Sequence, residues 1–222
     1  MTNTTDTAAY YARRASEYER VYDKPERQTD LLAIRAMVAE RLAGHRVLEV
    51  ACGTGFWTEP ISRTATSILA TDINEEVLNL ARTKHYPNEN VRFAKTDALT
   101  LEGISGSFTA AFVGFFWSHI PVGRTGAFLS VLHSKLPPGA LLVVIDNNHV
   151  EGSNTPISHT DEDGNTYQRR VLDDGSTHEI IKNFPSESEL REVTDESAHD
   201  VQYAALRYYW CLTYRAKPTR DI

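Results

Sequence analysis

Two glycines and three acidic residues lie close to the ends of successive apolar runs in this sequence. Gly53 and Gly55 follow the first run, and a turn with glycines lets the backbone approach a ligand closely. The helix expected next would offer unpaired N–H groups, and Glu49 precedes the turn. Asp72 ends the next run, nineteen residues after Gly53, where a carboxylate commonly binds ribose hydroxyls. Asp97 ends the third run and is placed to reach an adenine edge, so the set predicts a nucleoside-binding site.

The elements that would position these residues alternate between strands and helices. Strands that are apolar on both faces and separated by helices predict a parallel sheet covered on both sides. Ligands of such sheets bind beyond the carboxyl ends of the strands, where these features fall. The predicted strands are Arg46–Cys52, Ser67–Ile73, Val91–Asp97, Phe108–Trp117 and Ala140–Ile145. The predicted helices are Thr7–Asp23, a second from Pro25 to before Gly44, Phe56–Arg63, Glu75–His85 and Gly123–Leu136.

The last third of the sequence changes character. An Asp-Asp-Gly-Ser turn within residues 150–184 indicates a hairpin, and Ser186 with Glu189 forms a capping box at a helix start. Two final aromatic-rich strands have no helix between them, which predicts an antiparallel pair. The predicted elements are the strands Tyr167–Leu172 and Thr177–Lys182, the helix Ser186–Ser197, and the strands Val201–Tyr209 and Cys211–Lys217.

Composition limits the classes of protein to consider. The chain has 222 residues, with 30 acidic and 23 basic side chains and a net charge of −7, which weighs against a general nucleic-acid binder. Only Cys52 and Cys211 are present, so a disulfide scaffold is excluded and a reducing compartment is favoured. No secretory signal or membrane-spanning stretch is evident. We expect a single-domain cytoplasmic protein, monomeric or homodimeric, without nucleic-acid or membrane partners.

These motifs resemble those of the class I S-adenosylmethionine-dependent methyltransferases of the small-molecule type. The residues that carry the resemblance are LEVACGTG (48–55), ATDIN (70–74), TDAL (96–99), FVGFFWSHIP (112–121) and LPPGALLVVID (136–146), and it extends over most of the chain. It implies an α/β, doubly wound, seven-stranded, mostly parallel sheet of the Rossmann-like methyltransferase fold, in strand order 3-2-1-4-5-7-6. N-terminal helices in residues 1–44 would form a lid over one domain spanning residues 1–222.

The same resemblance implies the cofactor and its ligands. S-adenosylmethionine would bind and S-adenosylhomocysteine would be the product of methyl transfer to an O, N or S atom of a small molecule. The residues expected around the cofactor are Glu49, Ala51, Gly53, Gly55, Thr58, Asp72, Ile73, Asp97, Ala98 and Phe115.

Three other functions stay open at this point. A nicotinamide-dependent oxidoreductase would favour Gly-x-Gly-x-x-Gly, but Thr58 occupies the third glycine position, and Glu49 suits a cofactor with an amino group better than a pyrophosphate. A nucleic-acid methyltransferase often carries Asn/Asp-Pro-Pro-aromatic after its fourth strand, a motif not found here. A non-catalytic interaction module of the same fold would have less need of the glycines Gly53 and Gly55 and of the acids Asp72 and Asp97.

Methyl transfer requires alignment of the acceptor and exclusion of water, and a base helps where the acceptor carries a proton. His119 follows the fourth strand and is the candidate base, since imidazole titrates near neutrality; alternatively, Ser118 or His119 caps the next helix. Tyr11 is the second catalytic candidate. The candidate substrate residues are Tyr10, Trp117, Asn147, His149 and Arg169.

Two further features bear on the acceptor. Asp146-Asn147 resembles the metal pair of magnesium-dependent catechol-type O-methyltransferases, but the fourth strand ends without the acid that such a site needs, so we expect no metal. Residues 150–184 are expected to cover the substrate. Within them Arg169 either meets an acidic substrate group or lies on a solvated hairpin face.

Overall fold

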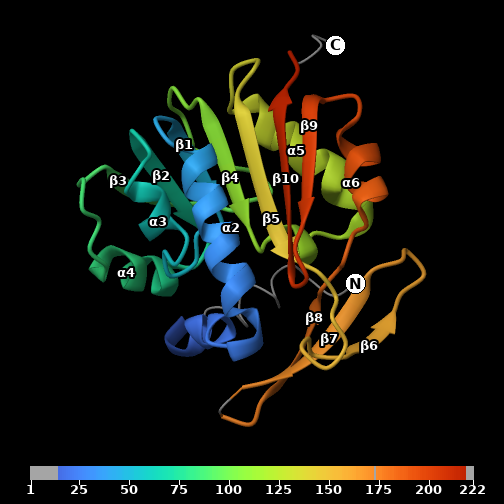
Figure 1. Cartoon of the computed structure of the whole chain (residues 1–222). Helices are drawn as coiled ribbons and strands as arrows, with labels where there is room; N and C mark the ends of the chain where they lie inside the picture. Colours follow the sequence, from blue (N-terminus) through green and yellow to red (C-terminus); the bar gives the residue numbers. More distant parts are fainter. Residues whose placement is uncertain (1–14, 173, 219–222) are drawn as a thin grey trace.

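A mixed sheet of seven strands organises the computed structural model, which describes residues 15–172 and 174–218. The strand order is β3-β2-β1-β4-β5-β10-β9, which confirms the predicted order (Figure 1). Strands β1 to β5 are parallel, whereas β10 runs antiparallel to both β5 and β9. The strands are β1 (Arg46–Val50), β2 (Ser67–Asp72), β3 (Val91–Lys95), β4 (Ala110–Gly114), β5 (Leu141–Asn147), β9 (Ala198–Ala205) and β10 (Tyr209–Ala216).

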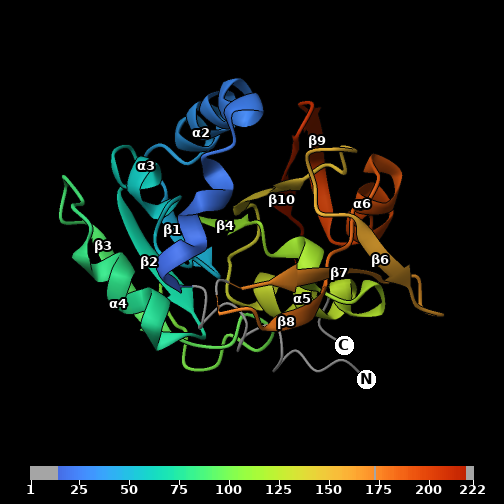
Figure 2. The same ribbon diagram turned by 90° about the horizontal axis from the view of Figure 1, so that it is seen from below.

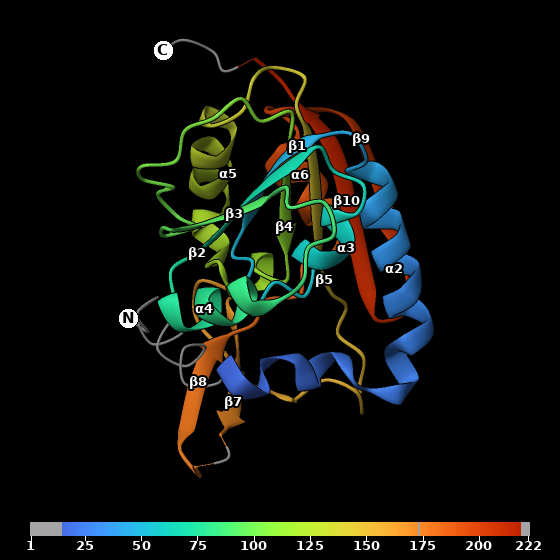
Figure 3. The same ribbon diagram turned by 90° about the vertical axis from the view of Figure 1, so that its left-hand side faces the viewer.

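Helices cover both faces of this sheet (Figure 3). Neighbouring residues of β1 point to opposite faces, so Val47 packs in the core cluster with α2 and α3, whereas Leu48 packs in the cluster with α5 and α6. Near-continuous apolar strands are therefore needed, as in other parallel sheets. The helices are α2 (Gln28–Arg41), α3 (Thr58–Ser62), α4 (Glu75–Thr83), α5 (Thr125–Ser134) and α6 (Glu187–Thr194).

Several predicted bounds were wrong. The fourth strand ends at Gly114 rather than Trp117, because Phe115 has a positive φ of 58° and leaves the strand conformation. The final strands begin and end a few residues earlier than expected. The described part of the first predicted helix is a 3₁₀ segment, η1, and further 3₁₀ turns follow. These segments are η1 (Ala15–Tyr22), η2 (Pro25–Arg27), η3 (Trp117–His119) and η4 (Val122–Arg124).

Residues between β5 and α6 build a second, three-stranded antiparallel sheet of β6 (Ile157–Thr160), β7 (Thr166–Val171) and β8 (Thr177–Ile181). The predicted hairpin is β7–β8, whereas β6 was missed. The capping box of α6 is confirmed, since Ser186 Oγ accepts a hydrogen bond of 3.3 Å from Glu189 N. The small sheet and η1 lie beyond the carboxyl ends of the parallel strands (Figures 1 and 2).

Membrane spanning is not indicated by any described helix, since none combines the required length with an apolar sequence. The two cysteines, Cys52 and Cys211, are buried and free.

Candidate active site

The glycine turn connects β1 to α3 in a conformation that only small residues allow. Gly55 has a φ of 78°, and a Cβ added there would lie 2.6 Å from Tyr86 Oη and 3.2 Å from the Cβ of Ala81. A side chain at this position would therefore collide with α4 and the residues after it. Ala51 also has a positive φ, of 55°, although it carries a Cβ. Helix α3 starts at Thr58, two residues later than predicted.

Glu49 is buried in β1, with 1% of its surface exposed, and neither carboxyl oxygen has a hydrogen-bond partner among the described residues. The nearby Thr58 hydroxyl also lacks one. Burial raises the pKa of Glu49 to about 8; the Thr58 hydroxyl opposes this rise and the charge of Asp72 adds to it. A buried carboxyl without a partner is costly, so the site fits a cationic group that would pair with it.

The other acids lie at neighbouring strand ends, as predicted. Asp72 ends β2 and is 9% exposed; its Oδ2 accepts a hydrogen bond from Gly53 N (2.9 Å) and its Oδ1 one from Asn74 N (2.9 Å). Burial raises the pKa of Asp72, and these backbone donors oppose the rise. Asp97 follows β3, and its Oδ1 accepts from Leu99 N (2.8 Å). Ala98 is buried, whereas Ile73 is 40% exposed.

An aromatic cluster joins the glycine turn to the end of β4. Phe115 stacks on Trp57 with ring centroids 5.5 Å apart and meets the edges of Tyr22 and Tyr209. Tyr22 of η1 in turn stacks on Phe56 at 3.7 Å, and its Oη accepts a hydrogen bond from Trp57 Nε1 (3.1 Å). The described part of the N-terminal segment is thus packed directly against the glycine turn.

Polar contacts hold the same segment in place. Thr54 Oγ1 donates to Glu19 Oε1 at 2.6 Å, and Glu19 also pairs with Lys84. Tyr10 and Tyr11, the tyrosines predicted to face the acceptor, lie outside the described residues.

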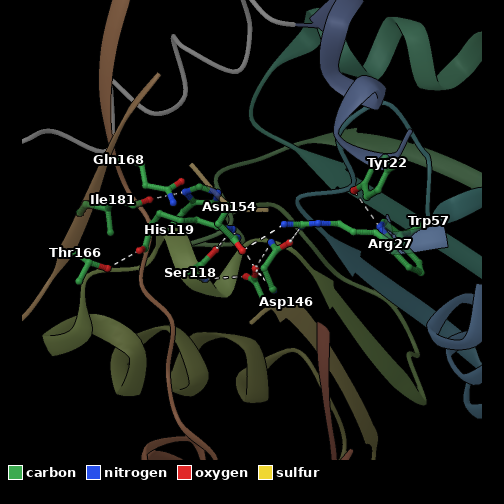
Figure 4. Close-up of polar contacts among 12 residues, drawn as sticks. Tyr22, Arg27, Trp57, Ser118, His119, Asp146, Asn154, Thr166, Gln168 and Ile181 are labelled. Atoms are coloured by element: carbon green, nitrogen blue, oxygen red, sulfur yellow. Dashed lines mark hydrogen bonds and ion pairs between the residues drawn. The ribbon is translucent and has the colours of Figure 1, made fainter. Parts of the chain in front are cut away.

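His119 belongs to η3 and is only 8% exposed. Its Nδ1 donates to Ile181 O at 2.7 Å, so the small sheet fixes the ring (Figure 4). Burial and the charge of Lys182 hold the pKa of His119 well below its usual range, although Asp146 opposes them. This direction argues against the titration near neutrality that the sequence suggested and favours a neutral imidazole. Neither Ser118 nor His119 is an N-cap, since Pro121 holds that position for η4.

A buried ion pair lies beside His119. Lys182 Nζ is 3.1 Å from Asp146 Oδ1 and donates to Ser118 Oγ at 2.6 Å. Asp146 also accepts from Ser118 N (2.9 Å) and Asn147 N (2.7 Å). Burial raises the pKa of Asp146, but the charge of Lys182 and the hydrogen bonds from Ser118 N and Asn147 N together outweigh burial, so the net pKa is lowered. In the described part of the chain, no cluster of three His, Cys, Asp or Glu residues could hold a metal ion.

The predicted acceptor residues are divided between two cavities. His119, Phe115 and Asn147 line a cavity of about 230 Å³ beneath the N-terminal segment. Trp117 and His149 instead line a larger hollow of about 720 Å³ between η3 and α6. Trp117 is 3% exposed and packs against Trp210, which is the role of a core residue.

The small sheet presents a different arginine to the first cavity from the one predicted. Arg169 is exposed and does not line it, whereas Arg170, the next residue of β7, does. Side chains alternate along a strand, so a shift of one residue reverses the face. Sequence reasoning also missed Lys24, Arg27 and Lys182. In the sequence, the only indication of these residues is the number of basic side chains in segments near the site.

Comparisons with known proteins find similarity to methyltransferases. A family model described as "Methyltransferase domain" matches residues 47–139. Demethylmenaquinone methyltransferase of Lactococcus lactis subsp. lactis (strain IL1403) is 28% identical over 113 residues, which are 49% of this chain and 44% of the relative. The corresponding enzyme of Staphylococcus aureus (strain MRSA252) is 29% identical over 108 residues, 47% of this chain and 44% of the relative. The match thus spans less than half the length of these relatives.

Solved structures match nearly the whole chain. The "DhpI-SAM-HEP complex" has a TM-score of 0.76 at 27% identity, covering 96% of this chain and 97% of that one. The "DhpI-SAH complex structure" has a TM-score of 0.74 with the same identity and coverage. Magnesium protoporphyrin IX methyltransferase (ChlM) from Synechocystis PCC 6803 with bound SAH has a TM-score of 0.66 at 16% identity, over 97% of this chain and 100% of that one, and it supports the fold alone.

Proposed function

Because this chain is a class I S-adenosylmethionine-dependent methyltransferase, we propose that it transfers the methyl group of this cofactor to an O, N or S atom of a small molecule. One observation carries the proposal. The buried Glu49 carboxyl has no hydrogen-bond partner among the described residues, and the cofactor's ammonium group would supply one. The nicotinamide alternative provides no such ammonium, and its third glycine is replaced by Thr58.

The residues present fit the cofactor. Glu49 would pair with its ammonium group, with Thr58 beside it, and Asp72 would bind the ribose hydroxyls. Asp97, Ala98 and Ile73 would surround the adenine. Ala51, Gly53 and Gly55 would lie beside the cofactor at the turn, where the absence of a side chain on Gly55 lets the turn pack closely against α4. When bound, S-adenosylmethionine supplies an electrophilic methyl group.

The chain's own residues align the acceptor and exclude water. Phe115, Tyr22 and Tyr209 form an apolar wall at the end of β4. His119 Nδ1 donates to Ile181 O, which fixes the neutral ring at the edge of the smaller cavity, and there the ring would help to orient the methyl acceptor. Because its pKa is lowered, His119 is a weak base. It would therefore orient the acceptor rather than take up the acceptor's proton.

The surrounding segments complete the proposal. Residues 1–44 act as a lid, in which Tyr10 and Tyr11 contribute to closure, and residues 150–184 cover the acceptor. Asn147 contacts the acceptor from the end of β5. No metal takes part, and the acceptor is neither a nucleic acid nor a membrane component.

A screen of candidate acceptors, scored by release of S-adenosylhomocysteine, tests the activity. Calorimetry with S-adenosylhomocysteine and with NADH tests the cofactor separately. We expect binding of the former and no signal from the latter. Tight NADH binding without S-adenosylhomocysteine binding would overturn the proposal.

A further inference from the structure

The smaller cavity is strongly cationic, although the chain as a whole carries a net charge of −7. Among the described residues, cationic side chains line it and carboxylates do not. The lining cations are Arg20, Lys24, Arg27, Arg170 and Lys182. They come from the N-terminal segment and from the small sheet, so two elements distant in sequence bring positive charge to one place.

Neutral groups hold the buried guanidinium of Arg27. Arg27 is 3% exposed and donates to Ser153 Oγ (2.9 Å), Asn147 Oδ1 (3.2 Å) and Asn154 Oδ1 (3.3 Å). Figure 4 shows this guanidinium extending from the N-terminal segment toward Asn154 and the neighbourhood of Asp146. Neutral acceptors orient a guanidinium without cancelling its charge, so Arg27 keeps its charge for a ligand.

Arg170 approaches the same cavity from β7. Its Nη2 donates to Gln168 Oε1 at 2.6 Å, and its buried Nε has no hydrogen-bond partner among the described residues. Burying an N–H donor of a charged group without an acceptor costs free energy, and a ligand that accepts its hydrogen bond would offset that cost.

Two carboxylates near these cations are already engaged. Asp146 pairs with Lys182, and Glu26 accepts a hydrogen bond from Ser153 Oγ. Lys24 donates to the carbonyl of Ser153. Burial is the largest cause that lowers the pKa of Lys24, and Arg27 and Arg170 lower it further, whereas Glu26 raises it. The cations therefore repel one another, and an anion between them would offset that repulsion.

The cavity also adjoins the proposed cofactor site. Phe115 at the end of β4 and His119 of η3 line it together with the cations. Phe115 stacks on Trp57 of the glycine turn, so the cavity and the cofactor site share one aromatic wall.

We propose that the methyl acceptor is a small acid whose oxyanion group, a carboxylate or a phosphate-like group, binds to Lys24, Arg27 and Arg170. This inference rests on the proposed function, and it names the class of acceptor. Guanidinium groups suit carboxylates and phosphates because their planar N–H donors match these oxyanions, and the buried Arg27 and half-buried Arg170 bring two such groups to the cavity. Neutral acceptors of the same shape would leave the positive charges unpaired and would bind more weakly.

Binding of inorganic phosphate and of acetate, measured by calorimetry on the protein saturated with S-adenosylhomocysteine, tests the inference. Saturation keeps the cofactor site filled, so that the anions cannot bind there instead of at the cations. We expect saturable binding of at least one anion that weakens as sodium chloride is raised. Preference between the two anions distinguishes a phosphate-like group from a carboxylate.

Variants locate the site. Arg170→Gln should weaken anion binding by about 10- to 100-fold, since a hydrogen bond to a charged group is lost, and leave S-adenosylhomocysteine affinity within about threefold. Lys24→Gln should also weaken anion binding. Arg191→Gln, on the exposed surface of α6, removes the same charge far from the cavity and should change neither affinity.

The results separate the two proposals. S-adenosylhomocysteine binding without anion binding, or loss of anion binding in Arg169→Gln but not in Arg170→Gln, would overturn the acidic acceptor and leave methyl transfer standing. Absence of S-adenosylhomocysteine binding would overturn the proposed function itself.

Discussion

Lys182 and Asp146 form a buried ion pair that fastens the small sheet to the end of β5. The Nζ and Oδ1 atoms are 3.1 Å apart, and the two side chains are 7% and 0% exposed. Lys182 directly follows β8, whereas Asp146 lies within β5, so the pair connects the small sheet between β5 and α6 to the central sheet. Both charges also shift the pKa of the neighbouring His119: Lys182 lowers it and Asp146 raises it.

Replacing Lys182 with methionine should lower the free energy of unfolding by about 3–5 kcal/mol, because the buried Asp146 carboxylate would lose its counter-charge. Chemical denaturation at pH 7 measures this. The double variant Lys182→Met/Asp146→Asn removes both charges and should be less destabilised than the single one. If the double variant lost as much free energy of unfolding as the single variant, or more, the unpaired Asp146 charge would not be the cause of the destabilisation.

Asp72→Ala should weaken S-adenosylhomocysteine binding by about 1.5–3 kcal/mol, the size expected for a hydrogen bond to a charged group. Calorimetry measures this effect. Glu76→Ala, at an exposed acid at the start of α4, is the control and should bind normally. Unchanged affinity in Asp72→Ala would remove this carboxylate from the cofactor site.

The order of the large sheet could be predicted because its signals are local. Each parallel strand is an apolar run that ends in a glycine turn or an acid, as in Arg46–Val50 and Ser67–Asp72. Strand β6 could not be predicted, since all four of its residues are exposed and no apolar alternation marks it. The run from Phe112 to Trp117 resembles one continuous strand, and only the backbone turn at Phe115 divides it.

The positions of the acids at the strand ends could be predicted from the sequence, whereas the contacts around Asp146 and Arg170 could not. Asp72 and Asp97 mark strand ends, so the sheet itself brings them to one edge. Lys182 meets Asp146 across 36 residues of sequence, and no spacing indicates that contact. The difference between Arg169 and Arg170 depends on which face of β7 meets the cavity, and the hairpin pattern leaves that undecided.

Glu49 should make cofactor affinity depend on pH. Burial raises its pKa to about 8, so the free protein holds the proton at neutral pH, whereas pairing with an ammonium favours the carboxylate. Affinity for S-adenosylhomocysteine should therefore rise up to about pH 8, with release of a proton. Calorimetry in buffers of different ionisation enthalpy detects that proton, and Glu49→Gln should abolish its release. A pH-independent affinity in the natural chain would contradict the pairing.

The same residue should make the free protein less stable as pH rises. The folded pKa of about 8 exceeds the usual 4.5, so between these values the folded state binds more protons than the unfolded state. The free energy of unfolding then falls as pH increases across that range. Glu49→Gln should flatten this slope and be more stable than the natural chain at pH 8, although it binds cofactor less well. Thermal unfolding without cofactor, scanned from pH 5 to 8, measures the slope, and a steeper slope in the variant would contradict this account.

Methyl transfer should survive EDTA. The Asp146 carboxylate, which resembled a magnesium ligand in the sequence, already accepts bonds from Lys182, Ser118 N and Asn147 N. A magnesium ion there would have to displace the ammonium. Turnover of the acceptor found in the screen, measured with EDTA and after addition of magnesium, tests this expectation. Loss with EDTA and recovery with magnesium would make Asp146 and Asn147 ligands.

His119 should orient the acceptor without titrating in the neutral range. Because burial and Lys182 lower its pKa, the ring stays neutral as pH falls from 8 to about 6, and turnover should show no inflection from an imidazole of ordinary pKa near 6.5. His119→Ala should lower turnover by about 10- to 100-fold, as for loss of one hydrogen bond to a charged or reacting group, and leave S-adenosylhomocysteine affinity within about threefold. Turnover, cofactor affinity and melting temperature measured on one preparation separate this role from a structural one. Natural turnover in His119→Ala would exclude any part in the reaction. An inflection near pH 6.5 that disappears in the variant would instead restore the imidazole as a base.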